Sequence, residues 1–345
     1  MADSVVPADG DAAADELPPL PPEPVAAPVG SNIEPNPAEM SPYAIHGLLL
    51  DITYTGERLI AVGERGNILV SRDGIRWAQV NVPTRATLTG LSFVDTQHGW
   101  AVGHDAAIIH TADGGRTWSL QAFNPELEQP LHDVFFADTR QGFAFGSFGL
   151  FWQTADGGKT WTEVHAPAVL EEGFHLNGMT RLKDGQFLIV GESGLLGLSA
   201  DGINWGRLES PYEGSYFGVL PRGEKGALIY GMRGNAYVTD DVRAGQWRKI
   251  NLATISSMFG AYAMGDGSII LVGADAVVLT VQPDETVERV ATYAGVASSG
   301  TITGIVRHPG GLMTVGESGV QPYQTKTAPT VPAVVTRDLQ TTDDF

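Results

Sequence analysis

Short apolar runs that end in glycine recur along the chain at a nearly constant interval. The run ends fall at seven positions separated by 40 to 45 residues, and another Gly or Ala follows three residues after each one. The seven glycines are Gly63, Gly103, Gly146, Gly191, Gly231, Gly273 and Gly316. A period of about 40 to 45 residues is typical of a propeller blade. The pattern therefore predicts seven copies of one structural unit.

Each repeat contains four segments of apolar or alternating residues, separated by Gly or Asp. In the first repeat these segments are 48–55, 58–63, 67–72 and 77–81. Alternation over five to eight residues indicates β-strands, and no segment shows a sustained helical period. We therefore predict an all-β chain that folds as a seven-bladed β-propeller of four-stranded antiparallel blades over residues 41–326.

A second motif follows about ten residues after the glycine of the first four repeats. It reads Ser or Thr, one residue, Asp-Gly, and then a Trp, and a stretched copy in the fifth repeat ends at Trp247. Asp accepts bonds from nearby backbone N–H groups, and Gly adopts backbone angles that other residues avoid. We predict structural turns at Ser71, Asp73, Gly74, Trp77, Thr111, Asp113, Gly114, Trp118, Thr154, Asp156, Gly157, Trp161, Ser199, Asp201, Gly202, Trp205 and Trp247.

These turns resemble the Asp boxes, or BNR repeats, of sialidases and related propellers. The segments 99–103 (GWAVG) and 110–118 (HTADGGRTW) are similar to those of the photosystem II stability/assembly factor-like family of bacterial propellers, and the likeness extends over 48–326. The resemblance implies a non-catalytic protein-binding scaffold, acting as an assembly or accessory factor for a membrane complex. Proteobacterial members resemble accessory proteins of export systems of the RND type, which makes such a transporter the implied partner. It also implies a periplasmic or envelope location, with a cytoplasmic one left open.

The two ends of the chain differ in composition from the repeats. Residues 1–40 hold nine prolines, eight acidic residues and no Lys or Arg, which predicts a disordered linker. Residues 327–345 are predicted to form an extended or disordered tail. The seventh repeat lacks a fourth strand, and we expect residues 41–47 to supply it, because an open ring leaves strand edges unpaired.

Charge and composition exclude several functions. The net charge of −19 disfavours nucleic acid as a partner, and the absence of Cys excludes disulfides and thiolate metal sites. The eight His residues show no zinc-binding spacing, so we predict neither metal nor cofactor. No apolar run is long enough to span a bilayer and no signal peptide is visible, so we expect no direct membrane insertion.

The central residues of the seven turns that follow the repeated glycines are expected to encircle one mouth of the channel, opposite the Asp boxes. They differ from blade to blade, which either a specific binding surface or neutral drift would produce. The candidate binding face is Arg65, His104, Phe148, Glu192, Arg233, Asp275 and Glu317, with Tyr212 and Tyr216 on a connection between blades.

Catalysis is the alternative to binding. Sialidase chemistry needs an arginine cluster and a set of acidic and tyrosine side chains; Arg65, Arg85 and Arg233 can face one mouth, but the arginine-containing N-terminal signature of sialidases is missing. We therefore predict that the chain is not an enzyme, with a carbohydrate-binding or glycoside-hydrolase propeller as the alternative. If the chain is a non-catalytic scaffold, we also expect no cluster of buried, converging ionisable side chains at the centre of the propeller.

Overall fold

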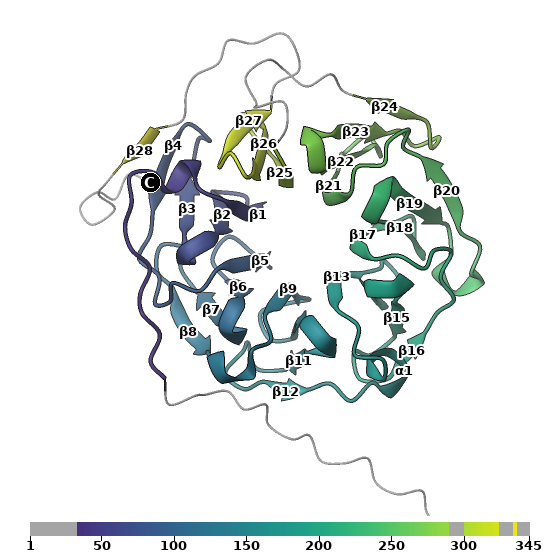
Figure 1. Ribbon diagram of the computed structural model, residues 1–345, viewed down its shortest axis with the longest axis horizontal. Coiled ribbons are helices and arrows are strands. Elements are labelled where there is room, and N and C mark those ends of the chain that lie inside the picture. The colour runs from purple at the N-terminus through teal and green to yellow at the C-terminus, as the bar shows by residue number, and fades with distance from the viewer. Residues whose placement is uncertain (1–32, 290–299, 324–333, 337–345) are drawn as a thin grey trace, which may run out of the picture.

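Seven antiparallel sheets surround a central opening in the computed structural model of the chain, which describes residues 33–289, 300–323 and 334–336 (Figure 1). The predicted seven-bladed β-propeller is confirmed. Each blade begins with a strand at the opening and proceeds outward through consecutive antiparallel neighbours.

The strands of the first four blades follow one another without crossing. Blade 1 contains β1 (Leu49–Tyr54), β2 (Leu59–Gly63), β3 (Ile68–Ser71) and β4 (Arg76–Gln79). Blade 2 contains β5 (Leu88–Phe93), β6 (Gly99–Gly103), β7 (Ile108–Thr111) and β8 (Ser119–Ala122). Blade 3 contains β9 (Leu131–Phe136), β10 (Gly142–Gly146), β11 (Phe151–Thr154) and β12 (Thr162–Glu163). Blade 4 contains β13 (Leu176–Arg181), β14 (Phe187–Gly191), β15 (Leu196–Ser199) and β16 (Trp205–Arg207).

The remaining blades repeat this order. Blade 5 contains β17 (Tyr216–Arg222), β18 (Gly226–Gly231), β19 (Asn235–Thr239) and β20 (Arg248–Asn251). Blade 6 contains β21 (Met258–Ala263), β22 (Ile269–Gly273), β23 (Val278–Val281) and β24 (Val287–Arg289). Blade 7 contains β25 (Ile302–His308), β26 (Gly311–Gly316) and β27 (Gln321–Tyr323), and β28 (Val334–Thr336) pairs in parallel with β4 of blade 1.

Helical structure is confined to single turns in the part of the chain that is described. The turns between second and third strands are η2 (Glu64–Gly66), η3 (His104–Ala106), η5 (Ser147–Gly149), η6 (Glu192–Gly194), η7 (Met232–Gly234) and η9 (Ala274–Ala276). Turns η1 (Ala44–His46), η4 (Pro125–Leu127) and η8 (Val242–Ala244) and the short helix α1 (Pro167–Leu170) lie in connections.

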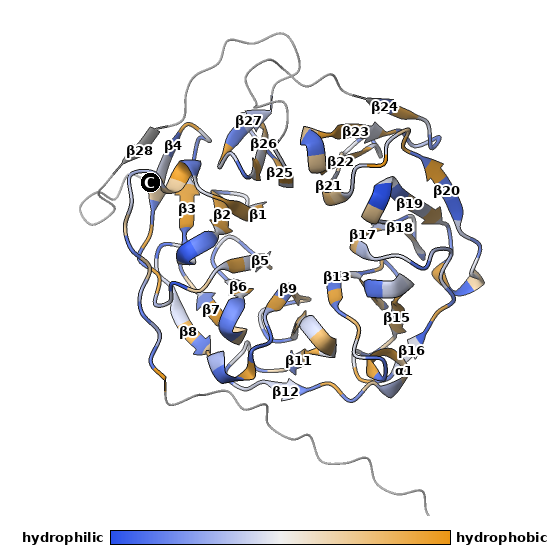
Figure 2. Ribbon diagram, viewed as in Figure 1, coloured by the Kyte–Doolittle hydropathy of each residue, from blue (hydrophilic) through white to orange (hydrophobic). Residues whose placement is uncertain are grey.

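The hydrophobic core lies between neighbouring blades. Every residue of the second strands β2, β6, β10, β14 and β22 is buried, and these strands carry the apolar runs that define the repeat (Figure 2). Aromatic rings join blades 2 and 3, where Trp100 stacks on Phe136 with ring centroids 3.5 Å apart. Burial of both faces of each blade explains why apolar residues run continuously along the second strands rather than alternating.

The ring closes differently from our prediction. Residues 41–47 form a turn and η1 instead of an outer strand, and the carbonyl oxygen of Ile45 accepts a bond of 3.1 Å from the N–H of Val320 in blade 7. Gly319 packs directly against that carbonyl, as Gly66 packs against Thr84 in the connection between blades 1 and 2. The segment therefore occupies the place of a connection between blades. The prediction was wrong because buried Ala44 and Ile45 are drawn into the core between blades 7 and 1.

The predicted terminal segments lie largely outside the described residues, which exclude 1–32, 324–333 and 337–345. Part of the predicted linker contacts the propeller, because the N–H of Ala38 donates to the carbonyl of Val82 and Gln79 bonds to the backbone of Glu39 and Ser41. The domain boundaries at residues 40 and 327 remain a prediction.

Candidate functional site

The Asp-box residues form four closely similar hydrogen-bonded turns. In blade 2 the carboxylate of Asp113 accepts bonds from the N–H groups of Arg116 and Thr117 and from the hydroxyl of Thr111. Burial alone would raise the pKa of Asp73, but bonds from Arg76 and Ile75 outweigh it and lower the pKa to about 2. These carboxylates are held in their turns, which gives them a structural role.

The tryptophans that end the Asp boxes are not equivalent. The indole N–H donates to a turn carbonyl for Trp77, Trp118 and Trp205. The indole nitrogens of Trp161 and Trp247 are buried and have no partner in the described part of the chain. In the stretched fifth copy, Asp241 caps η8 by accepting from the N–H of Arg243.

Six of the seven predicted mouth turns contain a residue other than glycine with left-handed backbone angles. Arg65, Phe148, Arg233 and Asp275 adopt φ values between 53° and 56°, which positions their side chains at the tip of each turn. The turns surround the opening in Figure 1, and we call this side of the disc the mouth face. Arg65, His104, Phe148, Arg233, Asp275 and Glu317 are exposed there, and Glu192 is half-buried.

One predicted residue of this face lies elsewhere. Tyr216 is completely buried, and its hydroxyl is 2.8 Å from the hydroxyl of Ser210. It begins the innermost strand of blade 5 at a position that is apolar in every blade, which explains its burial. Tyr212 is half-buried, with its ring 6.1 Å from that of Tyr216. Tyr216 is therefore part of the core and not of the binding face.

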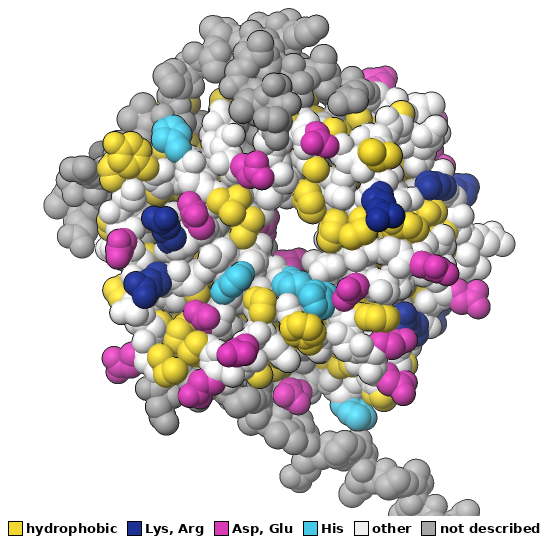
Figure 3. Space-filling model, in the orientation of Figure 1, with side chains coloured by type: hydrophobic (Ala, Val, Ile, Leu, Met, Phe, Trp, Pro, Cys, Tyr) yellow, Lys and Arg dark blue, Asp and Glu magenta, His cyan; other side chains and the backbone are white. Residues whose placement is uncertain are grey.

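Histidines and one exposed aromatic ring gather beside the opening, where Figure 3 shows histidine side chains in cyan. The ring of Phe148 is 62% exposed and lies 5.0 Å from the ring of His175. His175 in turn lies 5.4 Å from His132 and 4.0 Å from the carboxylate of Glu192. The turns of blades 3 and 4 thus bring together residues that are about 40 positions apart in the sequence.

The channel is lined by the innermost strand of every blade. A bulge near the start of each of these strands turns two adjacent residues toward the axis. The outer ring of these residues contains Leu50, Thr89, His132, Asn177, Phe217, Phe259 and Thr303. Phe217 and Phe259 stand next to each other, with ring centroids 5.2 Å apart. The space enclosed has a volume of about 240 Å³.

The second ring of channel residues forms the hub. It consists of glycine in five blades and of aspartate in blades 1 and 3, namely Asp51, Gly90, Asp133, Gly178, Gly218, Gly260 and Gly304. The Asp51 carboxylate accepts bonds of 2.7 Å from its neighbour Ile52 and 2.8 Å from Leu91 of blade 2. Asp133 accepts one bond, of 2.7 Å, from Val134. Acidic side chains are visible inside the opening in Figure 3.

Ionisable groups converge at the hub, but Asp51 and Asp133 are half-buried and only Tyr230 of the three is buried, so the expectation of no buried ionisable cluster there fails only in part. Burial raises the pKa of Asp51 to about 7, and burial together with the nearby Asp51 raises the pKa of Asp133 well above its ordinary value. Burial also raises the pKa of Tyr230, with the two carboxylates adding to the effect. Superposing the seven inner-strand sequences would have revealed this cluster, since Asp replaces Gly at one aligned position in two repeats.

Basic groups do not offset this charge. Of the residues that line the channel, His132 is the one with a basic side chain. Its Nδ1 lies 3.1 Å from Oδ1 of Asn177, and its Nε2 lies 2.9 Å from the hydroxyl of Ser147. Burial lowers the pKa of His132, which favours its neutral form. The arginines considered for sialidase chemistry, Arg65, Arg85 and Arg233, do not line the channel.

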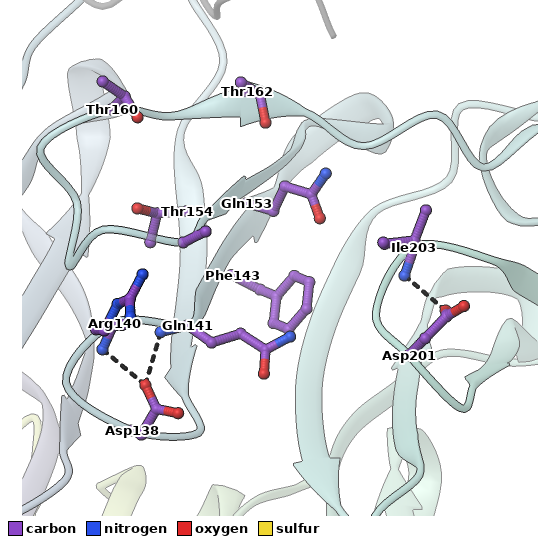
Figure 4. Close-up of a pocket in the computed structure, with 11 residues that line it drawn as sticks. Asp138, Arg140, Gln141, Phe143, Gln153, Thr154, Thr160, Thr162, Asp201 and Ile203 are labelled. Carbon is purple, nitrogen blue, oxygen red and sulfur yellow. Dashed lines mark hydrogen bonds between the residues drawn. The ribbon is translucent and has the colours of Figure 1, made fainter. Parts of the chain in front are cut away.

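A second cavity lies on the side of the Asp boxes, between blades 3 and 4 (Figure 4). It has a volume of about 450 Å³ and contains the exposed side chain of Ile203. Its carboxylates are already engaged, because Asp138 accepts from the N–H groups of Arg140 and Gln141, and Asp201 accepts from Ile203. The polar groups of this cleft therefore serve its own turns.

Two further observations concern metals and membranes. Within residues 33–289, 300–323 and 334–336, no three His, Asp or Glu side chains are grouped so as to hold a metal ion. None of the helices described in this chain has the length and apolarity needed to cross a membrane.

Comparison with known proteins agrees with the fold and the repeat. Within residues 70–126 and 121–292 the chain matches the model of the family described as "Photosynthesis system II assembly factor YCF48". The photosystem II assembly protein Ycf48 of Thermosynechococcus vestitus is 48% identical over 42 residues, which are 12% of either chain. The photosystem II assembly lipoprotein Ycf48 of Picosynechococcus is 39% identical over 44 residues, 12% of this chain and 13% of that one. These matches span a small part of the relatives' length.

A solved structure extends the likeness over nearly the whole propeller. The structure titled "YCF48 bound to D1 peptide" superposes with a TM-score of 0.63, covering 84% of this chain and 98% of that chain at 17% identity. At that identity the superposition shows a shared fold. Because the family model matches well over half of the residues, this chain belongs to the photosystem II assembly factor YCF48 family.

Proposed function

We propose that this protein is a non-catalytic assembly factor that binds a protein partner through its mouth face. The observation that carries the proposal is the exposed ring of Phe148 beside His175 and Glu192, next to an opening lined by Phe217 and Phe259. Exposed aromatic rings surrounded by polar groups are the usual anchors of protein interfaces. Membership of an assembly-factor family supports the same conclusion.

The partner is proposed to be a membrane complex. Relatives are named for photosystem II assembly, three of them as lipoproteins, and one solved relative is titled as bound to a D1 peptide. These names support an extended segment of a membrane protein as the ligand and an envelope location for this chain. An export complex of the RND type remains our specific prediction, and it rests on the sequence resemblance alone.

Two equally exposed apolar residues on opposite faces provide a matched test. Phe148 on the mouth face and Ile203 beside the Asp boxes are both 62% exposed. A photoreactive phenylalanine analogue at each position, followed by irradiation in the native host, reports which face meets a partner. We expect crosslinks to subunits of one membrane complex from position 148 and none from position 203.

Substitutions at the same positions measure affinity. Phe148→Glu is expected to weaken binding of the crosslinked subunit at least tenfold, whereas Ile203→Glu leaves it unchanged, with both variants retaining the wild-type melting temperature. Equal crosslinking from both positions would contradict the proposal. Turnover of a panel of glycosides by the purified protein, lost in Asp133→Asn, would instead favour the hydrolase alternative.

A further inference from the structure

The hub contains acceptor groups whose hydrogen-bonding capacity is only partly used by the described residues. Tyr230 is 6% exposed, and its hydroxyl extends over Gly218 into the channel without a hydrogen-bond partner among the described residues. One carboxylate oxygen of Asp133 is also without a partner, since its only bond is to Oδ1. An unpartnered hydroxyl on a side chain buried as deeply as Tyr230 is rare in folded proteins and calls for a ligand or water, whereas the Asp133 carboxylate is half-buried.

The three side chains come from alternate blades around the axis. Asp51 belongs to blade 1, Asp133 to blade 3, and Tyr230 to the second strand of blade 5. Both carboxylates lie against the same strand of blade 2, because Asp51 bonds to Leu91 and Asp133 lies over Gly90. Asp51 lies close enough to Asp133 to disfavour its ionisation, and both carboxylates disfavour ionisation of Tyr230. An ion at the axis would therefore face oxygen atoms on three sides.

We propose that the hub is a binding site for a single primary ammonium group, held by Asp51, Asp133 and the hydroxyl oxygen of Tyr230. A primary ammonium has three N–H donors arranged around its C–N bond, which matches three acceptors arranged around an axis. Its charge supplies the counter-ion that the lining residues lack, and the two half-buried carboxylates are stabilised by such pairing. A planar guanidinium, with its donors in one plane, does not match this arrangement.

The rest of the channel suits an alkyl chain attached to that ammonium. Phe217 and Phe259 stand in the outer ring, between the hub and the mouth face. Aromatic faces accommodate both the methylene groups of an alkylammonium and its charge. The space of about 240 Å³ is small, which restricts the ligand to one unbranched chain.

A lysine side chain of a partner and a free alkylamine share this chemistry. A partner's lysine as the ligand rests on the proposed function, because the partner would insert that side chain from the mouth face. The site itself does not depend on that function, so small probes test it separately.

The first experiment titrates n-butylammonium chloride into the full-length protein in amine-free buffer at pH 8 and follows the backbone amide signals of Gly90 and Gly218 by NMR. We expect saturable shifts, with n-butanol, the neutral analogue, producing none. Asp133→Asn and Tyr230→Phe are each expected to weaken binding, the former at least tenfold. Glu224→Gln removes an exposed carboxylate on the opposite face and should bind as wild type does.

Two outcomes would overturn the proposed site. One is the absence of saturable amide shifts in the wild-type protein, and the other is an unchanged affinity of Asp133→Asn for n-butylammonium. Asp133→Asn is the primary variant, because Asp51 accepts two backbone bonds and its replacement risks misfolding. Guanidinium chloride at low concentration serves as a charged competitor, and if it displaces n-butylammonium at equal concentration, selectivity for an ammonium is refuted.

The second experiment distinguishes the two sources. An acetylated, amidated peptide containing one lysine between glycines is titrated in the same way. Binding tighter than that of n-butylammonium indicates a partner's lysine, and the Ile203→Glu variant, altered on the opposite face, should leave n-butylammonium binding intact. Binding of n-butylammonium without binding of the peptide assigns the site to a free amine.

Discussion

At the scale of single residues, the Asp boxes differ in one hydrogen bond that has a measurable effect. Trp77 donates its indole N–H to the carbonyl of Gly74, whereas the indole nitrogen of Trp161 has no partner in the described structure, although both rings are completely buried. Replacing Trp by Phe removes the same part of the side chain at both positions. Only at Trp77 does it also leave the buried carbonyl of Gly74 without its indole donor.

We predict that Trp77→Phe lowers the free energy of unfolding by about 1 kcal/mol more than Trp161→Phe does. Urea denaturation of the two variants, measured against the wild-type protein under the same conditions, checks this. A larger loss for Trp161→Phe would show that ring packing, and not the hydrogen bond, distinguishes the two sites.

The hub carboxylates make stability depend on pH in a defined direction. The folded state raises the pKa of Asp51 from its usual 3.8 to about 7, so the folded chain holds that proton more tightly than the unfolded chain. This group therefore lowers the free energy of unfolding as the pH rises from about 4 to about 7, and has no further effect above that.

We predict that Asp133→Asn is more stable than the wild-type protein at pH 8 by on the order of 1 kcal/mol, since it removes a half-buried charge next to Asp51, and that the difference shrinks at pH 5. Urea unfolding in amine-free buffer measures both values, with Glu224→Gln as the control for loss of one negative charge. A constant difference between pH 5 and pH 8 would contradict the assigned ionisation.

Residue roles were predictable from sequence where the interacting groups are neighbours in the chain. The Asp-box turns span fewer than ten residues, so their Asp, Gly and Trp pattern contains the whole interaction. Asp51, Asp133 and Tyr230 meet only after the ring has formed, and each lies in a different repeat. The prediction that Tyr216 lies on the surface was wrong because its position at the start of β17, and not its residue type, decides its burial.

At the scale of elements, the contact between η1 and blade 7 closes the ring. A Cβ on Gly319 would lie 1.9 Å from the carbonyl oxygen of Ile45, and the glycine has a φ of 72°. Gly223 has a similar φ of 61° but nothing within 4 Å of such an atom. An alanine at either position would be strained by the left-handed backbone angles, but only an alanine at 319 would also push residues 45 and 46 away. Comparing the two variants therefore separates these two effects.

We predict that Gly319→Ala destabilises the fold by several kcal/mol, while Gly223→Ala costs only the roughly 1 kcal/mol of a left-handed alanine. Thermal unfolding followed by circular dichroism compares the two, and deletion of residues 41–47 should lower the melting temperature further than Gly319→Ala. Equal melting temperatures for the two alanine variants would show that closure tolerates displacement of η1.

The strand pattern was correct for the repeats and wrong at the closure. Apolar runs bounded by Gly predicted strands such as β2 and β3 within one residue of their observed bounds at either end. The missing fourth strand of blade 7 suggested that residues 41–47 would supply it, because sequence alone does not show whether an apolar pair such as Ala44-Ile45 enters a sheet or a core. Tertiary packing decided that question.

At the scale of the whole molecule, burial falls from the second strand of each blade toward the rim. The second strands of blades 1 to 6 are completely buried, whereas the outer strands β8, β16 and β20 contain exposed residues and β12 has only two residues. Local opening therefore costs least at the rim.

We predict that amide hydrogen exchange is slowest in residues 59–63, 99–103, 142–146 and 187–191 and fastest in the outer strands. Exchange measured by mass spectrometry on peptides from each blade tests this, with the mouth turns as an internal reference for fast exchange. Similar protection from axis to rim would indicate that the blades open as whole units.

The arrangement of Asp133 over Gly90 has a consequence for how this protein changes over evolutionary time. A side chain at position 90 would bring its Cβ within 2.6 Å of the Asp133 carboxylate, so position 133 constrains position 90 across a gap of 43 residues. The same Cβ would lie 2.9 Å from the Cα of residue 133 and 3.2 Å from the carbonyl oxygen of His132, so the glycine is required whichever side chain stands at position 133. Gly90 should therefore persist even in descendants that have lost the acidic group, whereas position 133 is free to change.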